Sequence, residues 1–187
     1  MFVFTGTDSL KIACEGNIEN LLDYETVSSG GHPTMADYCY RGMFYGCTSL
    51  TSAPTLPATT LADYCYEGMF KDCTALTTAP ELPATTLTQS CYYDMFYGCT
   101  SLTSAPELPA TTLAPSCYYE MFYGCTKIKL STTQTGEYQT AYRIPKSGTG
   151  TTASSALSNM FRNTGGSFTR TPSINTTYYL STSNTVV

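Results

Sequence analysis

The residues of this chain that could most readily take part in chemistry are its nine cysteines. The C-x7-C spacing within each copy of a repeat differs from the close pairs typical of zinc sites. Stacked turns about 5 Å apart would permit disulfides, so bridges remain an alternative. We expect buried, reduced thiols that pack as small apolar groups, and no metal. Eight of the nine fall into two columns: Cys39, Cys65, Cys91, Cys117 and Cys47, Cys73, Cys99, Cys125, with Cys14 outside them.

Few other residues could support catalysis. The single histidine, His32, lies in a Gly-Gly-His-Pro loop sequence, and a Cys–His nucleophilic pair would need an exposed thiol beside it. Glu81 and Glu107 share one repeat column and could hold Ca²⁺ only weakly. We therefore interpret these acids as a solvated edge, and predict no catalytic residue, no metal and no cofactor.

Composition narrows the possible partners. The formal charge is −5 and only 12% of residues are charged, which argues against nucleic acid and against a polybasic membrane patch. No segment approaches the roughly 20 apolar residues that would span a bilayer, so no membrane insertion is expected. The start, Met1-Phe-Val-Phe-Thr-Gly, lacks the basic and apolar regions of a secretory signal.

A near-literal repeat of 26 residues must position these side chains. Three copies occupy residues 35–60, 61–86 and 87–112, and a fourth begins at 113–130. This period is typical of leucine-rich repeats, whose copies bury their apolar faces on one another. We expect an α/β fold, a right-handed leucine-rich-repeat solenoid with 26-residue turns. The expected core columns are Met43-Phe44, Met69-Phe70, Met95-Phe96 and Met121-Phe122; Tyr40, Tyr66, Tyr92 and Tyr118; Leu50, Leu76 and Leu102; Leu56, Leu82 and Leu108; and Met35, Leu61, Leu87 and Leu113.

Two segments of each copy have local patterns. The apolar spacing of C-Y-x-x-M-F-x-x-C fits one face of a 3.6-residue helix, which predicts a short helical turn. The Thr-rich T-S-L-T-S-A-P segment predicts a strand that ends at proline. One such strand per copy would give one parallel sheet face along the solenoid.

The ends of the chain should cap this array, because a solenoid end otherwise exposes its core. We divide the chain into an N-terminal cap (1–34), the solenoid (35–130) and a C-terminal cap (131–187), with irregular β-type caps. Met1–Phe4 and Leu10–Ile12 could supply a capping strand, and 18–22 a helix or turn. A degenerate repeat at 157–164 predicts a fifth turn or a capping helix, and 171–180 alternates like a strand.

Variable columns indicate where the array could bind. Two of them flank the buried Met-Phe pair and should point outward: Arg41, Glu67, Tyr93 and Tyr119, and Tyr45, Lys71, Tyr97 and Tyr123. Tyrosine has an apolar body and a polar tip, which suits contacts with a protein or a glycan. We predict that these eight residues form the ligand-binding face. The alternative is that the rings pack flat on one another as a ladder.

The repeat pattern L-P-A-T-T-L-x-x-x-C-Y-x-x-M-F-x-G-C-T-S-L-T-S-A-P resembles the BspA-like leucine-rich-repeat surface proteins of gut and oral bacteria. The family Cys and Leu match the columns of Cys73 and Leu76. The resemblance implies an extracellular or cell-surface protein that acts in adhesion or binds a protein or glycan. Similar arrays in phages of gut bacteria make a virion or tail-associated interaction protein an alternative, and a passive spacer is a third.

Overall fold

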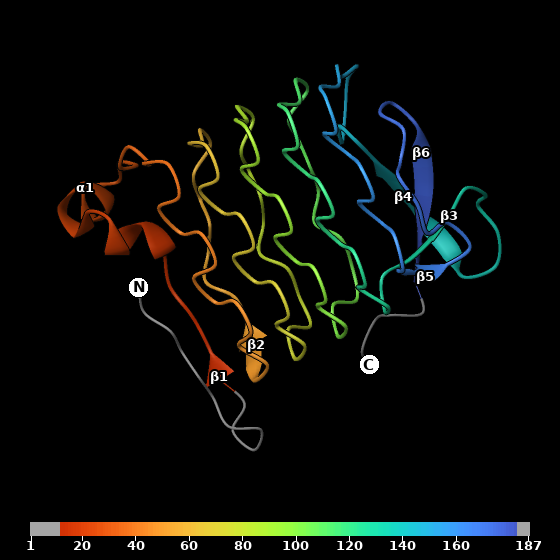
Figure 1. Cartoon of the computed structure of the whole chain (residues 1–187), viewed down its shortest axis with the longest axis horizontal. Helices are drawn as coiled ribbons and strands as arrows, with labels where there is room; N and C mark the ends of the chain where they lie inside the picture. Colours follow the sequence, from red (N-terminus) through yellow and green to blue (C-terminus); the bar gives the residue numbers. More distant parts are fainter. Residues whose placement is uncertain (1–11, 183–187) are drawn as a thin grey trace.

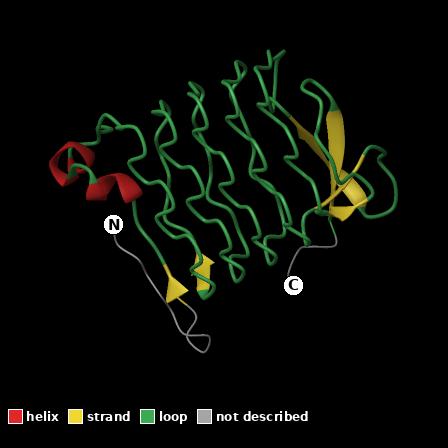
Figure 2. Ribbon diagram, viewed as in Figure 1, coloured by secondary structure: helices red, strands yellow, loops and turns green. Residues whose placement is uncertain are grey.

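The structure is a computed structural model that describes residues 12–182 of the chain. It is a mixed α/β protein with two small sheets and few helices (Figure 2). Between a short helical region at the N-terminal end and a sheet at the C-terminal end, the chain runs through a row of stacked coils (Figure 1). Each 26-residue copy forms one of these coils.

Backbone hydrogen bonds along one side of each coil hold the stack together. We call this segment the turn run; it comprises 36–47, 62–73, 88–99, 114–125 and 153–164. In the first four turn runs every second amide donates to the next coil, as Phe70 does to Met95 (2.9 Å), and the amides between them close local turns, as Met69 does onto Tyr66 (3.2 Å). Five amides cross each junction in this way; between the second and third coils they belong to Tyr64, Tyr66, Gly68, Phe70 and Asp72.

The predicted helical turn is wrong, because the turn run is a chain of overlapping turns with a period of four residues. Every fourth residue has a positive φ, as at Gly42 (58°), Asp94 (54°) and Glu120 (50°). Left-handed residues interrupt a right-handed helix, and they turn alternate amides toward the neighbouring coil. Over nine residues, turns with a four-residue period and an α-helix place the same side chains on one face. The apolar spacing alone therefore could not distinguish the turns from a helix.

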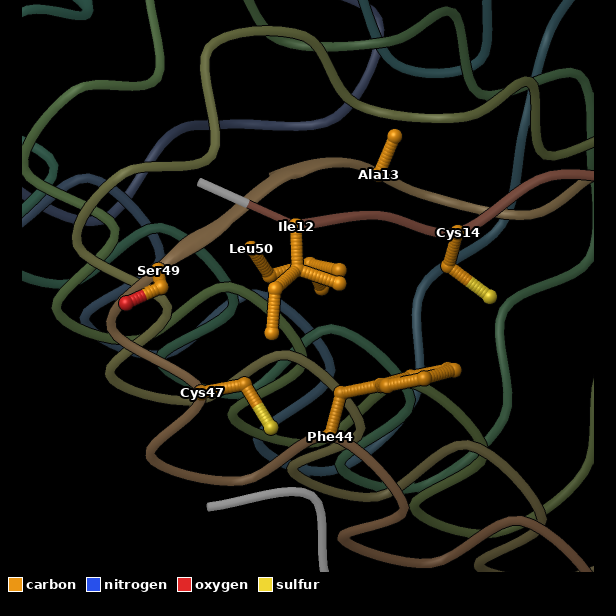
Figure 3. Close-up of a pocket in the computed structure, with 7 residues that line it drawn as sticks. All are labelled: Ile12, Ala13, Cys14, Phe44, Cys47, Ser49 and Leu50. Carbon is orange, nitrogen blue, oxygen red and sulfur yellow. The ribbon is translucent and has the colours of Figure 1, made fainter. Parts of the chain in front are cut away.

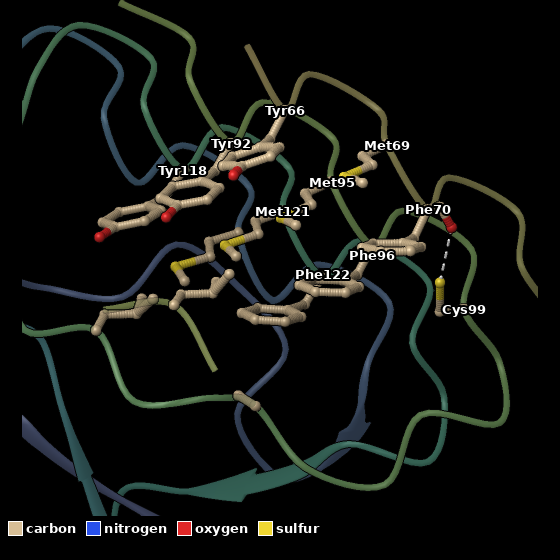
Figure 4. Packing of buried hydrophobic residues seen from close by; sticks show 14 of the residues in the cluster. Tyr66, Met69, Phe70, Tyr92, Met95, Phe96, Cys99, Tyr118, Met121 and Phe122 are labelled. Carbon is tan, nitrogen blue, oxygen red and sulfur yellow. Dashed lines mark hydrogen bonds between the residues drawn. The ribbon is translucent and has the colours of Figure 1, made fainter. Parts of the chain in front are cut away.

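Most of the predicted core columns lie inside the stack, although Met35 and Leu87 are only partly buried. Phe70 and Phe96 are fully buried, and their rings stack nearly parallel with centroids 5.6 Å apart. The Tyr and Met columns run beside them (Figure 4). The Phe column continues through Phe122 to Phe161 (5.4 Å). Each coil therefore supplies one layer of a continuous core, and the end coil shows it least completely, since Met43 is only half-buried.

The cysteine columns are packed as thiols within this core. Cys99 donates a hydrogen bond from Sγ to the carbonyl of Phe70 in the previous coil (3.1 Å; Figure 4), and Cys73 makes the same contact with Phe44 (3.0 Å). Burial raises the pKa of the Cys73 thiol to about 12. All nine cysteines are thiols and not disulfides, and among them Cys14 and Cys39 are partly exposed. A thiol that must keep its proton to make its bond is a poor nucleophile.

The expected parallel sheet along the array is wrong. Strands at this position of the repeat occur only at the two ends: β2 (Leu50–Ser52) pairs with β1 (Ile12–Ala13), and β3 (Lys129–Ser131) pairs with β5 (Gly165–Gly166), both in parallel. The middle coils have only isolated bridges such as that between Thr60 and Thr86. Two prolines per coil interrupt this side, since proline has no amide to donate.

A short cap covers the N-terminal end. The 3₁₀ helix η1 (Ile18–Leu21) begins at Asn17, whose side chain accepts from the amide of Glu19, and α1 (Tyr24–Ser28) begins at Asp23, which accepts from Thr26. Both are the side-chain caps that satisfy otherwise unpaired amides. Of the predicted capping strand only Ile12 lies among the described residues, within β1; Met1–Phe4 lie outside them.

A fifth coil and a sheet follow the fourth copy. Residues 153–164 form a turn run, not a helix, and accept bonds from the fourth coil, as Met160 does from Phe122 (3.0 Å). The intervening chain adds β4 (Tyr138–Arg143), and β6 (Thr177–Ser181) lies antiparallel between β4 and β3 in the order β4-β6-β3-β5. The predicted alternating segment forms a strand only from Thr177 onward. This sheet covers the C-terminal end (Figure 1).

Candidate binding face

The turn runs alternate buried pairs with outward pairs of side chains. In the second coil Cys65-Tyr66 and Met69-Phe70 are buried, whereas Glu67 and Lys71 are partly exposed. We call the outward pairs of all five turn runs the turn face. All eight residues of the predicted binding stripe lie on it: Arg41, Tyr45, Glu67, Lys71, Tyr93, Tyr97, Tyr119 and Tyr123.

The structure brings four of the five predicted tyrosines together in stacks. Tyr93 and Tyr119 stack with centroids 4.7 Å apart, and Tyr97 and Tyr123 do the same at 4.7 Å, with interplanar angles of 5° and 3°. All four rings remain partly exposed. The predicted alternative of a Tyr ladder thus describes how the rings pack, and their edges and hydroxyls still reach the surface. Tyr45 stands apart and is 57% exposed.

Charged residues of the stripe pair across neighbouring coils. Arg41 Nε lies 2.9 Å from a carboxylate oxygen of Glu67. Lys71 Nζ lies 2.7 Å from Asp94 Oδ2 and 4.3 Å from the ring centroid of Tyr97, which is the geometry of a cation–π contact. The cations are therefore held within the face.

Sequence reasoning missed three participants on this face. Asp94 is 8% exposed, and burial raises the pKa of its carboxyl even though Lys71 opposes the shift. Glu120 occupies the matching place in the next coil and accepts from Asn159 (3.1 Å). Arg162 lies over the ring of Tyr123 (6.0 Å). The first two stand at left-handed positions that the helical interpretation hid, and the third lies in the divergent fifth coil.

Stacked rings lie closer together on the turn face than in the interior. Outward rings lie 4.7–4.8 Å apart, whereas buried rings of the Tyr and Phe columns lie 5.4–5.7 Å apart. The outward tyrosines are therefore stacked more closely than the aromatic rings of the core.

His32 lies in a second polar region, away from the turn face. Its Nδ1 is 2.7 Å from Oε2 of Glu19, a carboxylate with no exposed surface. Oε1 of Glu19 has no hydrogen-bond partner. Thr34, Thr59 and Thr60 share a cleft of about 340 Å³ with this pair. The burial of Glu19 could not be predicted from the sequence, because this residue lies between Asn17 and Asn20 in the cap.

Two further hollows lie at other parts of the surface. Glu81 and Glu107 border a proline-lined cleft of about 410 Å³, where Glu107 is paired with Lys146. Both acids are exposed, as the solvated-edge interpretation predicts. A small apolar cavity of about 100 Å³ lies between β1 and the first coil, lined by Ile12, Phe44 and Leu50 among others (Figure 3).

Within residues 12–182, no group of three or more His, Cys, Asp or Glu side chains is arranged to hold a metal ion. In that same part of the chain, no helix is long and apolar enough to cross a membrane. Comparison with known protein families, curated proteins and solved structures finds no match. The resemblance to BspA-like proteins stays a prediction.

Proposed function

We propose that this chain is a non-enzymatic binding module of the leucine-rich-repeat class, which recognises a protein or glycan through the turn face. The observation that carries the proposal is the pair of closely stacked tyrosine columns on this face, whose rings remain partly exposed. Repeat arrays commonly bind through one extended face, where a row of side chains can contact one partner.

The rigidity of the stripe supports the same proposal. Stacking holds Tyr93 against Tyr119 and Tyr97 against Tyr123 at 4.7 Å, and Lys71 is fixed by Asp94. Side chains that are ordered before binding lose little conformational entropy when a partner arrives. Tyrosines of this kind carry much of the free energy at protein interfaces.

The resemblance to surface proteins suggests where the module acts. We propose an extracellular or cell-surface location and a role in adhesion, with attachment to a virion as the alternative. The buried thiols are compatible with either setting, because each hydrogen-bonded Sγ lies inside the core and not at the surface.

The experiment is a screen of the purified chain against a glycan array and a protein array, repeated with variants. Tyr97→Ala and Tyr123→Ala should each weaken binding to the hits by more than about 1 kcal/mol. Tyr97→Phe keeps the ring stack and removes only the hydroxyl, so it separates a lost contact from a disturbed fold. Tyr24→Ala is the matched control, because Tyr24 is an exposed tyrosine in α1, outside the turn face.

Two results would contradict the proposal. One is a set of hits whose binding is unchanged in Tyr97→Ala and Tyr123→Ala. The other is a sharp fall in melting temperature in both variants with no change in binding, which would make these tyrosines a packing ladder alone. The fold would stand in either case.

A further inference from the structure

The faces of the central tyrosine rings on the turn face are already occupied. Tyr97 lies between Tyr123, at 4.7 Å, and the ammonium group of Lys71, at 4.3 Å from its centroid. Tyr123 has Tyr97 on one side and Arg162 on the other (6.0 Å). Sugar rings pack on aromatic faces through their C–H groups. These two rings offer a partner only edges and hydroxyls.

In the second tyrosine column, Tyr93 and Tyr119 stack on one another, so at least one face of each ring is covered. Tyr45 is the exception, because it is the most exposed of the five predicted tyrosines. Tyr38 and Tyr64 on the same face also cover one another (4.8 Å), and the guanidinium of Arg41 lies 5.6 Å from the ring centroid of Tyr38. The single ring of Tyr45 is not a platform along which a glycan chain could stack. The aromatic stripe is therefore better suited to a polypeptide than to a sugar chain.

The charge of the turn face is negative. Its outward positions hold six acidic and three basic residues, a formal charge of −3 out of the −5 of the whole chain. The acids are Asp37, Asp63, Glu67, Asp72, Asp94 and Glu120, and the bases are Arg41, Lys71 and Arg162. Charges of one sign gathered on one surface favour a partner of the opposite sign.

The basic residues of the face already contact other side chains of the same face. Carboxylates are therefore left as acceptors for a partner. Arg41 is paired with Glu67 and Lys71 with Asp94, while Arg162 lies on Tyr123. Asp94 is more than nine-tenths buried, and its Oδ1 has no hydrogen-bond partner. Glu120 stands beside it in the next coil and is partly exposed. A buried carboxylate oxygen without a donor is costly to leave unpaired. It lies just beneath the surface, so a partner's donor reaches it when the neighbouring side chains move aside.

From the occupied ring faces, the acidic balance and the unpaired oxygen of Asp94, we infer that the partner of the turn face is a basic polypeptide segment. Its Lys or Arg side chains reach the carboxylates between the two tyrosine columns, and its backbone lies against the ring edges. This inference rests on the proposed function, since it identifies the class of partner for the same face.

The test uses labelled octalysine as the cationic probe and fully acetylated octalysine as its neutral control. A third probe, chitohexaose, represents a neutral glycan. The face variant is Asp63→Asn with Glu120→Gln, which keeps the acceptors for Gln89 and Asn159. The matched variant, Glu25→Gln with Glu81→Gln, changes the net charge equally at exposed positions outside the face.

The expected result is that octalysine binds and its acetylated form does not. The face variant should weaken octalysine binding roughly fivefold or more, and the matched variant less than about twofold, because attraction between exposed charges is short-ranged at physiological salt. Equal losses in the two variants would overturn the inference, since binding would then follow net charge alone. Thermal unfolding of each variant checks that the fold is unchanged.

The two proposals fail in different ways. Suppose that chitohexaose binds, that Tyr97→Ala or Tyr45→Ala abolishes this binding, and that octalysine does not bind. The basic-partner inference is then wrong, and the proposed binding face stands. If no variant of the face changes the binding of any probe or array hit, both are wrong. Failure of octalysine to bind at all also overturns the inference.

Discussion

The two sides of each coil are held by different forces. In the turn run, five backbone amides per junction donate to the next coil at 2.7–3.0 Å. On the opposite side, which we call the proline side (53–60 and its counterparts), the coils are joined by sparse bonds such as that from Thr85 to Thr59 (3.1 Å) and by packed leucines. The backbone sets the spacing on the first side, and side chains set it on the second.

This difference explains which columns vary. Bonds between backbone groups do not depend on the side chain, so the outward positions of the turn run can change from Arg41 to Glu67 or Tyr93 without loss of the stack. The proline side lacks that support, and its Leu82 and Leu108 repeat without change. A repeat protein built in this way can alter its outward face while its packing stays constant.

Alkaline pH should produce the largest effect, because it acts on every buried thiol of the core together. Burial raises the pKa of Cys65, Cys73 and Cys117 from 9.0 to about 12. A raised pKa in the folded state means that the unfolded chain ionises first, so this stability is complete below pH 9 and is lost toward pH 12. Melting temperature followed by circular dichroism should fall steeply above pH 9. Cys73→Ala should make the fall shallower, and a flat profile to pH 11 would contradict the thiol packing.

Removal of an aromatic ring should cost more stability on the buried face of the turn run than on its outward face. Phe96→Ala leaves a cavity between two stacked rings and should cost about 3–5 kcal/mol in the free energy of unfolding. Tyr93→Ala, three residues earlier on the outward face, should cost only about 0.5–1.5 kcal/mol, the loss of one stacked pair. Urea denaturation measures both. Similar costs for the two would remove the distinction between packing positions and outward positions.

The left-handed positions allow a test of the turn geometry itself. Gly124 has a φ of 73°, and a Cβ there would meet no atom closer than 3.8 Å, so a substitution tests conformation alone. Gly124→Ala should cost about 1–2 kcal/mol. Gly124→Asn should cost less, because asparagine tolerates this region and the fifth coil has Asn163 in the matching place. Equal losses in chemical denaturation would argue against the left-handed turn.

The sequence was sufficient for the register and for the core. A literal 26-residue repeat fixes which side chains lie above one another, so the burial of Phe70, Phe96 and the Leu columns could be predicted. The repeat register also predicted which of the eight residues of the predicted binding stripe share a column. The prediction of one strand per coil held only at the ends of the array, where β1 and β5 supply partners.

The local backbone could not be read from apolar spacing. A signal was present in the other residues: glycine, serine, aspartate or asparagine occupies most of the left-handed positions, such as Gly98, Ser116 and Asn159, at intervals of four. Asp94 and Arg162 escaped the sequence reasoning because their roles depend on that geometry and on the placement of the fifth coil. Side-chain partners across coils are set by the turns, which the apolar pattern does not encode.

Amide hydrogen exchange measured by NMR tests most directly the claim that the turn run holds the array together. The amides of Phe70 and Phe96, which donate to the next coil, should exchange slowest, at rates that reflect global unfolding. Amides of the proline side in the same coils, such as that of Glu81 on the exposed surface, should exchange orders of magnitude faster. Slow exchange along the whole proline side, with fast exchange at Phe70 and Phe96, would show a continuous sheet there and contradict the account.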